Sequence, residues 1–502
     1  MWLGRFQKSL SNPLNINWPD APLRILGIYA SYDSDTCIIK NFKEKLANIK
    51  AIINTWKGRN LTMIGRIQII KTFLISQLLY VSSALDIPEH IIRELDHIIT
   101  DFVWKGIRAK VGKLVLKKGI EEGGLKMPDL HTMIETLRLK WINRLFSNTS
   151  LIWPQFLSKY LLRSGINLNA LLRADYNMKY LNIIPNTLPA FYYKMLEIWS
   201  RVGESSEGKS TFLWYNKALL INGKSFFYQD FYEAGITHIQ DLFKTDGTVI
   251  PFSHWINKGV SKSNMIKWVG LIQMTTKLMK TKEQYNHTGE RNDTHYIIID
   301  NEKIPLKTCR SHCIYTSLLG KKIGTDVCIP RVSKFLRIDN IANWTKAYLR
   351  ANKFPTETKI KEFQFKFLHD ILVNRYWLKK WNIVEDDLCQ ICHEDVDNLA
   401  HVFWECTLTK LFWSQFNTWY NSKCNDEYHL NQEQAFLGTE NELLCGLIFV
   451  AKRHVYCNRL DQKAPNFQMF TVLVQKMKDT ELFIAKQNNK VEFWLKRWQN
   501  FL

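Results

Sequence analysis

The chain of 502 residues is 46% apolar and 13% aromatic, which excludes a wholly disordered protein and predicts about two to four subdomains. Its 68 Lys and Arg outnumber its 47 Asp and Glu, for a net charge of +21. This excess favours a polyanionic partner such as nucleic acid over the alternative of a basic but merely solvated surface.

The first ten residues, MWLGRFQKSL, lack the apolar run of a secretory signal. The longest apolar stretches, such as LLCGLIFVA at 443–451, are too short to span a bilayer. We therefore expect no membrane partner and an intracellular location, in the nucleus or the cytoplasm. The ten cysteines would stay reduced there.

Apolar residues at helical spacing predict three helices in the N-terminal part of the chain. The first runs from Phe42 to Trp56, the second covers 62–82, and the third opens at Pro88, a residue suited to a first helical turn. Residues 40–118 hold 15 Lys or Arg against 6 Asp or Glu. We therefore expect these helices to form a strongly basic cluster.

The next segments alternate between turns and regular elements. Paired glycines and a proline in EEGGLKMPDL, 121–130, predict a turn, and Asp129 is placed to cap the helix that follows. The polar runs 203–210 and 281–296 indicate loops. YIIID at 296–300 predicts a strand, the pattern is helical again from about 340, and 467–498 predicts two basic helices.

Four potential metal ligands lie close together near the C-terminal end. Cys389, Cys392, His401 and Cys406 form a C-x2-C-x8-H-x4-C array. Structural zinc sites use four Cys or His ligands, whereas catalytic sites keep one position open for water. The array therefore predicts a closed, structural Zn²⁺ site. Coincidental buried thiols are one alternative, and a redox C-x-x-C pair, which leaves the last two residues unexplained, is another.

The segment before this array, 359–381, interleaves cations with aromatic rings, a pattern typical of nucleic-acid binding. Phe363, Phe367 and Ile371 follow a helical step, so we expect them in the core. The loop 393–400 is acidic and would repel phosphates. Three cations remain as contact candidates, with a solvated surface as the alternative: Arg375, Lys379 and Lys380.

Several segments, in matching order, resemble the reverse transcriptases of LINE-type (non-LTR) retrotransposons. Those similar to the region from the last palm strands onward are MWLG at 1–4, LRILGI at 23–28, WKGRNLTMIGRIQIIKTFLISQLLY at 56–80, FVWKG at 102–106, GGLKMPDL at 123–130 and the weaker 213–243. The four array residues and Trp413 resemble the C-terminal zinc-binding segment of the family. Asp397 occupies the position of an acidic residue that usually precedes its histidine.

The resemblance implies a mainly α fold with a basic helical thumb bundle, a mixed α/β connecting region, a small CCHC zinc-binding domain and C-terminal helices. It predicts six parts along the chain: a remnant of the palm end (1–35), a helical thumb (36–118), a helical connection (119–202), a mixed α/β connecting region (203–335), a helical region with the zinc knuckle (336–420) and a C-terminal helical region (421–502).

The resemblance also implies that the chain grips template RNA or an RNA–DNA hybrid. Thr62 is expected to cap a helix whose N-terminus faces a phosphate. The candidates for backbone contacts in the thumb, each with a solvated side chain as the alternative, are Lys57, Arg59, Thr62, Arg66 and Lys71.

Polymerases hold two metal ions with paired carboxylates, which the family carries on a palm hairpin. The adjacent aspartates here, Asp386 and Asp387, lie beside the zinc array and are expected to be solvated. We therefore expect a non-catalytic, nucleic-acid-binding fragment. Two alternatives stay open: the C-terminal half of an active RNA-directed DNA polymerase that starts upstream of Met1, with that half as a partner, or a domesticated RNA-binding or scaffold protein.

Overall fold

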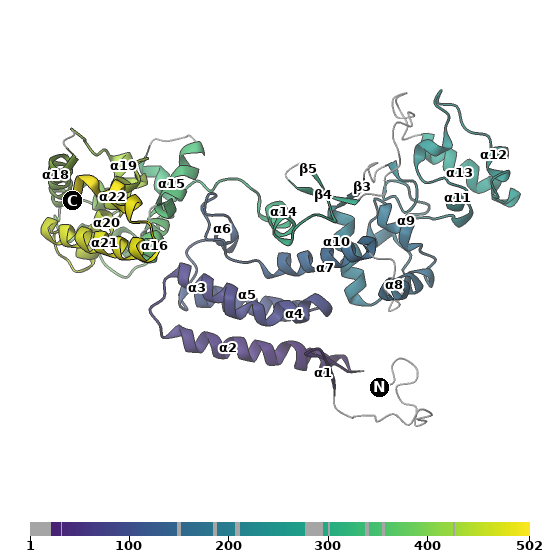
Figure 1. Cartoon of the computed structure of the whole chain (residues 1–502), viewed down its shortest axis with the longest axis horizontal. Coiled ribbons are helices and arrows are strands. Elements are labelled where there is room, and N and C mark those ends of the chain that lie inside the picture. The colour runs from purple at the N-terminus through teal and green to yellow at the C-terminus, as the bar shows by residue number, and fades with distance from the viewer. Residues whose placement is uncertain are drawn as a thin grey trace. The chain divides into compact units, whose positions relative to one another are not determined.

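The structure is a computed structural model that describes residues 22–31, 33–147, 152–183, 188–205, 211–276, 295–299, 302–336, 341–353, 357–424 and 427–501 (Figure 1). It is mainly α-helical, as predicted. The chain divides into two compact units: the first consists of 1–43, 77–92 and 129–322, and the second of 44–76, 93–128 and 323–502. The expectations for 1–21, Tyr32, 206–210 and 281–294 concern residues outside the described part.

The first unit combines helices with two small antiparallel sheets, β1–β2 and β3–β4–β5. Its elements are β1 (Leu23–Ile25), β2 (Ile28–Ala30), α1 (Ser34–Ile38), α7 (Leu130–Ser147), α8 (Trp153–Leu162), α9 (Leu168–Arg173), α10 (Ala190–Val202), β3 (Gly203–Ser205), α11 (Gln229–Glu233), α12 (Phe252–Ile256), α13 (Met265–Thr276), β4 (His295–Ile299), β5 (Glu302–Pro305) and α14 (Ser311–Ile323). The strand predicted at 296–300 is therefore confirmed as β4.

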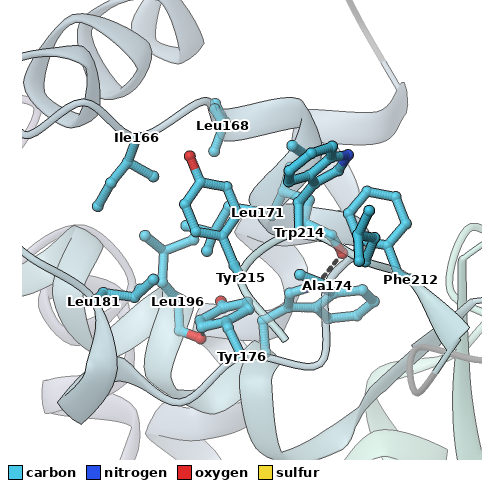
Figure 2. Close-up of a cluster of buried hydrophobic side chains, with 14 of the residues drawn as sticks. Ile166, Leu168, Leu171, Ala174, Tyr176, Leu181, Leu196, Phe212, Trp214 and Tyr215 are labelled. Atoms are coloured by element: carbon cyan, nitrogen blue, oxygen red, sulfur yellow. Dashed lines mark hydrogen bonds between the residues drawn. The ribbon is translucent and has the colours of Figure 1, made fainter. Parts of the chain in front are cut away.

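An aromatic core holds the first unit together. Trp214 and Tyr215 lie among side chains from α9 and α10 (Figure 2). Two other aromatic side chains of this core pair their buried polar atoms with backbone carbonyls. Tyr176 Oη donates to the Leu196 carbonyl at 2.6 Å, and Trp199 Nε1 donates to the Leu172 carbonyl at 2.8 Å. Large rings of this kind can be buried because each N–H or O–H finds a backbone acceptor.

The second unit is built from three separate stretches of chain. Its helices are α2 (Glu44–Lys57), α3 (Met63–Ile69), α6 (Lys113–Lys117), α15 (Ile341–Lys353), α16 (Thr358–Leu368), α17 (Arg375–Lys380), α18 (Thr407–Cys424), α19 (Gln432–Leu437), α20 (Glu442–Leu460), α21 (Phe467–Gln487) and α22 (Val491–Trp498). Two further helices, α4 (Ser76–Ala84) and α5 (Glu89–Trp104), have residues in both units.

The helix α20 lies within the core of the second unit and contacts α15, α16 and α21. It is buried on nearly all sides, as expected of a helix that is apolar all round. The apolar run 443–451 is therefore part of a core helix. Its one buried lysine, Lys452, donates to the Phe436 carbonyl at 2.7 Å, and burial lowers the pKa of this amine.

The paired glycines form a close contact inside the second unit. Gly123 has a φ of +93°, and a Cβ there would lie 2.6 Å from the ring of Tyr348. A Cβ on Gly124 would lie 2.1 Å from the Lys118 carbonyl oxygen. The turn is tied to the helix α16 because His369 Nε2 bonds the Gly123 carbonyl at 2.9 Å. The predicted turn is thus confirmed, and glycine is needed there for lack of space.

Most other predicted elements are also confirmed. The loops expected at 203–210 and 281–296 are wrong where they meet, because Gly203–Ser205 and His295–Ile297 pair as the antiparallel strands β3 and β4. The helix expected at 62–82 is α3 and α4, interrupted by a π-helical turn at Ile70–Leu74, and the tail forms α21 and α22. Asp129 caps α7, because its Oδ1 accepts from the Thr132 N–H at 2.8 Å. Among the described residues no single helix could cross a membrane by length and composition, although α3 and α4 with the turn between them, bent by 42°, pass that test together.

Candidate metal centre and the basic cleft beside it

The four residues of the array meet in space. Their ligand atoms lie within 4.8 Å of one another. Cys389 and Cys392 lie on a small hairpin closed by a bridge between Leu388 and Val396. His401 opens the π-helical turn His401–Glu405 and Cys406 directly follows it. A short hairpin and a wide helical turn therefore bring both halves of the array together.

Backbone bonds fix the hairpin. The Cys389 N–H donates to the Asp395 carbonyl and the His393 N–H donates to the Cys389 carbonyl, both at 2.9 Å. His393 has a φ of +60°, which lets the chain reverse after the second cysteine.

Two side chains of the next helix, α18, stabilise the π-helical turn His401–Glu405 by hydrogen bonds. Thr409 Oγ1 donates to the Val402 carbonyl at 2.9 Å, and Trp413 Nε1 donates to the Phe403 carbonyl at 2.8 Å. A π-helical turn frees carbonyl groups, and these two side chains satisfy them.

The cluster fits a tetrahedral Zn²⁺ ion. A Zn–S bond of about 2.3 Å places two tetrahedral sulfur ligands roughly 3.8 Å apart, within the observed spread. Cys392 Sγ lies 3.2 Å from His401 Nε2, so this nitrogen faces the sulfur atoms. His401 Nδ1 is buried without a hydrogen-bond partner among the described residues, and the carboxylate of Asp395 is 3.9 Å away. A small shift would let Asp395 orient the ring, as carboxylates do for metal-bound histidines.

The thiols are also electrostatically suited to a cation. A hydrogen bond from Cys406 lowers the pKa of Cys389, whereas the same contact raises the pKa of Cys406. Both shifts describe two neighbouring thiols that share one proton, because two thiolates side by side repel each other. A divalent cation could take the place of that proton and bind both sulfur atoms.

The centre is anchored to the core by a buried ion pair. The carboxylate of Asp397 is fully buried, and its Oδ1 accepts from Arg459 Nε on α20 at 2.7 Å. Its Oδ2 accepts from the Arg375 N–H at 2.7 Å. Asp397 thus connects the metal centre, α17 and α20. Asp397 was expected in an acidic loop that repels phosphates and, by resemblance, before the histidine, but it is buried and paired. No sequence signal indicated Arg459, whose partner lies 62 positions away.

The structure places the three predicted cations of α17 next to the metal centre. Arg375 pairs with Asp386 at 2.7 Å, and Lys379 pairs with Asp387 at 2.9 Å. These bonds lower the pKa of both aspartates. The adjacent aspartates are thus exposed partners of basic side chains. Lys380 lies over the ring of Trp377, with Nζ 5.2 Å from the centroid.

The nucleic-acid contacts predicted for the segment 57–71 lie in different environments. Lys57 and Arg59 are exposed, and the Arg59 guanidinium lies 4.5 Å from the Trp56 ring centroid. Lys71 is on the surface too, and partial desolvation together with the charge of Lys126 lowers its pKa.

Arg66 is placed in the interior instead. Its side chain is 1% exposed, and Nη1 donates to the Phe102 carbonyl at 2.6 Å. The guanidinium therefore joins α3 to α5 within the second unit. The sequence of α3 contains no feature that distinguishes this buried arginine from an arginine on the surface.

Thr62 caps α3 as predicted, since its Oγ1 accepts from the Gly65 N–H at 3.1 Å. The neighbouring Met63 N–H donates to the Glu362 carboxylate of α16 at 2.9 Å. A protein carboxylate therefore lies at the helix N-terminus where a phosphate was expected.

A basic cleft of about 320 Å³ opens beside this helix start, within the second unit. Its lining residues come from all three stretches of the unit: Asn60, Leu61, Thr62, Lys105, Lys359, Glu362, Phe363, Lys366, Leu372, Arg453, Tyr456, Cys457 and Leu460. Four of them are cations, and the carboxylate of Glu362 is paired with Lys366 at 2.5 Å. No sequence signal indicated Lys105 and Arg453, because they join the cleft only through tertiary packing.

The region that contains the cluster matches a known family. Residues 330–413 match the family described as zinc-binding in reverse transcriptase. The matched range contains all four residues of the cluster, the anchoring Asp397 and Trp413.

Comparison with known proteins agrees. The chain is 28% identical over 207 residues, 39% of its length, to the Transposon TX1 uncharacterized 149 kDa protein of Xenopus laevis. The aligned part spans 15% of that protein. The two comparisons confirm the resemblance to the C-terminal part of a LINE-type reverse transcriptase.

Proposed function

Because the chain carries a zinc-binding region of reverse transcriptases, we propose that it grips template RNA or an RNA–DNA hybrid without catalysing synthesis. The observation that carries the proposal is the basic cleft, where four cations meet one already paired carboxylate. Clustered Lys and Arg supply most of the affinity of proteins for nucleic-acid backbones. Chemistry is left to a polymerase palm, proposed as a partner from the same polyprotein.

The cleft residues and the exposed part of the thumb segment are the proposed backbone contacts. Lys359 and Arg453 are the strongest candidates in the cleft, and Lys57 and Arg59 continue the positive charge at the end of α2. Arg375 and Lys379 are expected to contribute less, because a phosphate would first have to displace Asp386 and Asp387.

We propose Zn²⁺ as the bound metal and assign it a structural role. Three thiols and one imidazole match its preferred donors and already supply four ligands. Bound zinc would hold the hairpin against the wide turn and, through Asp397, against α20. The reduced thiols that such a site requires fit the proposed location in the nucleus or the cytoplasm.

The salt dependence of binding tests the nucleic-acid proposal. Each lost phosphate contact should reduce the slope of log affinity against log salt by about 1. The variant Lys359→Gln/Arg453→Gln should therefore bind a duplex RNA more weakly and with a slope shallower by about 2. Lys476→Gln/Lys496→Gln, which removes two exposed lysines elsewhere, is the charge-matched control. Equal slopes for wild type and the cleft variant would refute the assignment of the cleft.

A further inference from the structure

A second cavity, of about 200 Å³, lies next to α17 in the same unit. Its lining residues are Lys110, Arg331, Asp370, Ile371, Trp377 and Trp381. The proposed function uses none of them. Two indole rings and two unassigned cations thus surround one small space.

The two indoles form a platform. The Trp377 and Trp381 rings are stacked, with centroids 6.0 Å apart and planes at 23°. Trp377 lies within α17 and Trp381 directly follows this helix, one turn further on, so helix geometry sets their spacing. Trp381 is 45% exposed although it is a large apolar side chain. Trp377 stacks on this indole and the Lys110 ammonium lies over it, so a planar ligand would stack on Trp381 by taking the place of that ammonium.

Buried contacts hold the platform rigidly. Trp377 Nε1 donates to Asp370 Oδ1 at 3.2 Å, and Lys334 Nζ pairs with Asp370 Oδ2 at 2.6 Å. Asp370 has a φ of +49° because the chain reverses directly after α16, and its N–H donates to the Phe367 carbonyl. Its carboxylate is therefore already neutralised and orients Trp377.

Positive charge surrounds the rings. Lys110 Nζ lies 4.6 Å from the Trp381 ring centroid, and Arg331 lines the same cavity. An aromatic pocket can also bind an alkylammonium group, but Lys110 and Arg331 would repel one. They favour a ligand that combines a flat ring with a negative charge. A nucleotide has both.

We propose that this cavity holds an unpaired nucleotide of the bound strand, with its base on Trp381 and its phosphate near Lys110 and Arg331. The inference rests on the proposed function, since it takes the partner to be nucleic acid. It adds a preference for single strands, because bases inside a duplex are stacked on their neighbours and cannot offer a free face. Its volume, below the roughly 300–1,000 Å³ of drug-sized pockets, suits one ring system.

The cavity also lies within electrostatic reach of the basic cleft. Desolvation is the main cause that lowers the pKa of Lys110, and the positive charge of Lys366, which lines that cleft, is the second cause. A strand held by its phosphates in the cleft could therefore place a neighbouring base in the cavity.

The test uses the full chain, a fluorescein-labelled oligoadenylate and a blunt-ended RNA duplex with the same number of phosphates. Trp381→Ala should weaken binding of the single strand by about 5- to 150-fold and leave duplex binding unchanged. Phe493→Ala, which removes a 74% exposed ring on α22, is the matched control and should change neither. Equal affinity of Trp381→Ala and wild type for the single strand, or an equal loss on both RNAs, overturns the inference.

A second measurement needs no variant and therefore does not depend on the folding of one. Wild-type protein should bind an abasic strand of the same length more weakly than oligoadenylate, by a similar factor. If both strands bind equally, backbone charge explains binding and the base-stacking site is refuted while the proposed function stands. If wild type binds neither RNA at any salt concentration, the proposed function itself is wrong.

Discussion

The buried pair of Asp397 and Arg459 is expected to determine the stability of the metal-binding region. Burial lowers the pKa of the Arg459 guanidinium to about 10, so the interior disfavours its charged form and the Asp397 carboxylate becomes its essential counter-charge. Removing one member of a buried pair costs about 3–5 kcal/mol because the other charge stays buried and unpaired. We therefore expect Asp397→Asn, which keeps the volume and removes the charge, to lower the free energy of unfolding by at least about 3 kcal/mol.

The assay is urea unfolding of the zinc-loaded chain, followed by zinc release to a chromophoric chelator and by tryptophan fluorescence. Urea leaves the ion pair unscreened, unlike a guanidinium salt. Asp387→Asn makes the same chemical change in an exposed pair with Lys379 and should not shift the transition measurably. A loss below about 1 kcal/mol for Asp397→Asn would place the pair in the class of weak surface interactions and contradict the reasoning.

Three further outcomes are expected. Cys389→Ser/Cys392→Ser should lose the bound metal and loosen 360–420, so unchanged metal content by native mass spectrometry would rule out the site. Burial lowers the pKa of His369 to about 4, so the unfolded state takes up a proton at a higher pH than the folded state does. The free energy of unfolding should therefore fall as the pH drops from about 6.5 towards 4. His369→Gln should reduce this fall by up to about 3 kcal/mol in urea titrations. Purified protein with template, primer and magnesium should extend no primer, and template-dependent extension would contradict the non-catalytic proposal.

The sequence was informative where a signal is local. Helical spacing located α2, α5 and the tail helices, and the array spacing predicted the cluster of Cys389, Cys392, His401 and Cys406. The alternating phenylalanines of α16 were correctly expected in the core, since Phe363 and Phe367 are buried. These features depend on residues a few positions apart, or on chemistry that admits few alternatives.

Tertiary pairing could not be predicted in the same way. Arg66 and Arg453 are both helical arginines, yet one donates to a buried carbonyl and the other lines an open cleft. Their difference depends on α5 and α16, which lie far away in the sequence. Likewise, the aromatic residues on α17 gained a cavity only because Lys110 and Arg331 come to lie beside them.

The discontinuous second unit has a consequence for synthesis on the ribosome. The helices α2 and α3 emerge long before α16, whose Glu362 accepts from the Met63 N–H. All of 129–322 is translated in between, so the face of α3 that packs against α16 lacks this partner during that time. Closing a longer loop costs little, only about 0.6 kcal/mol for each doubling of its length. The delay therefore bears on aggregation and chaperone use during translation more than on final stability.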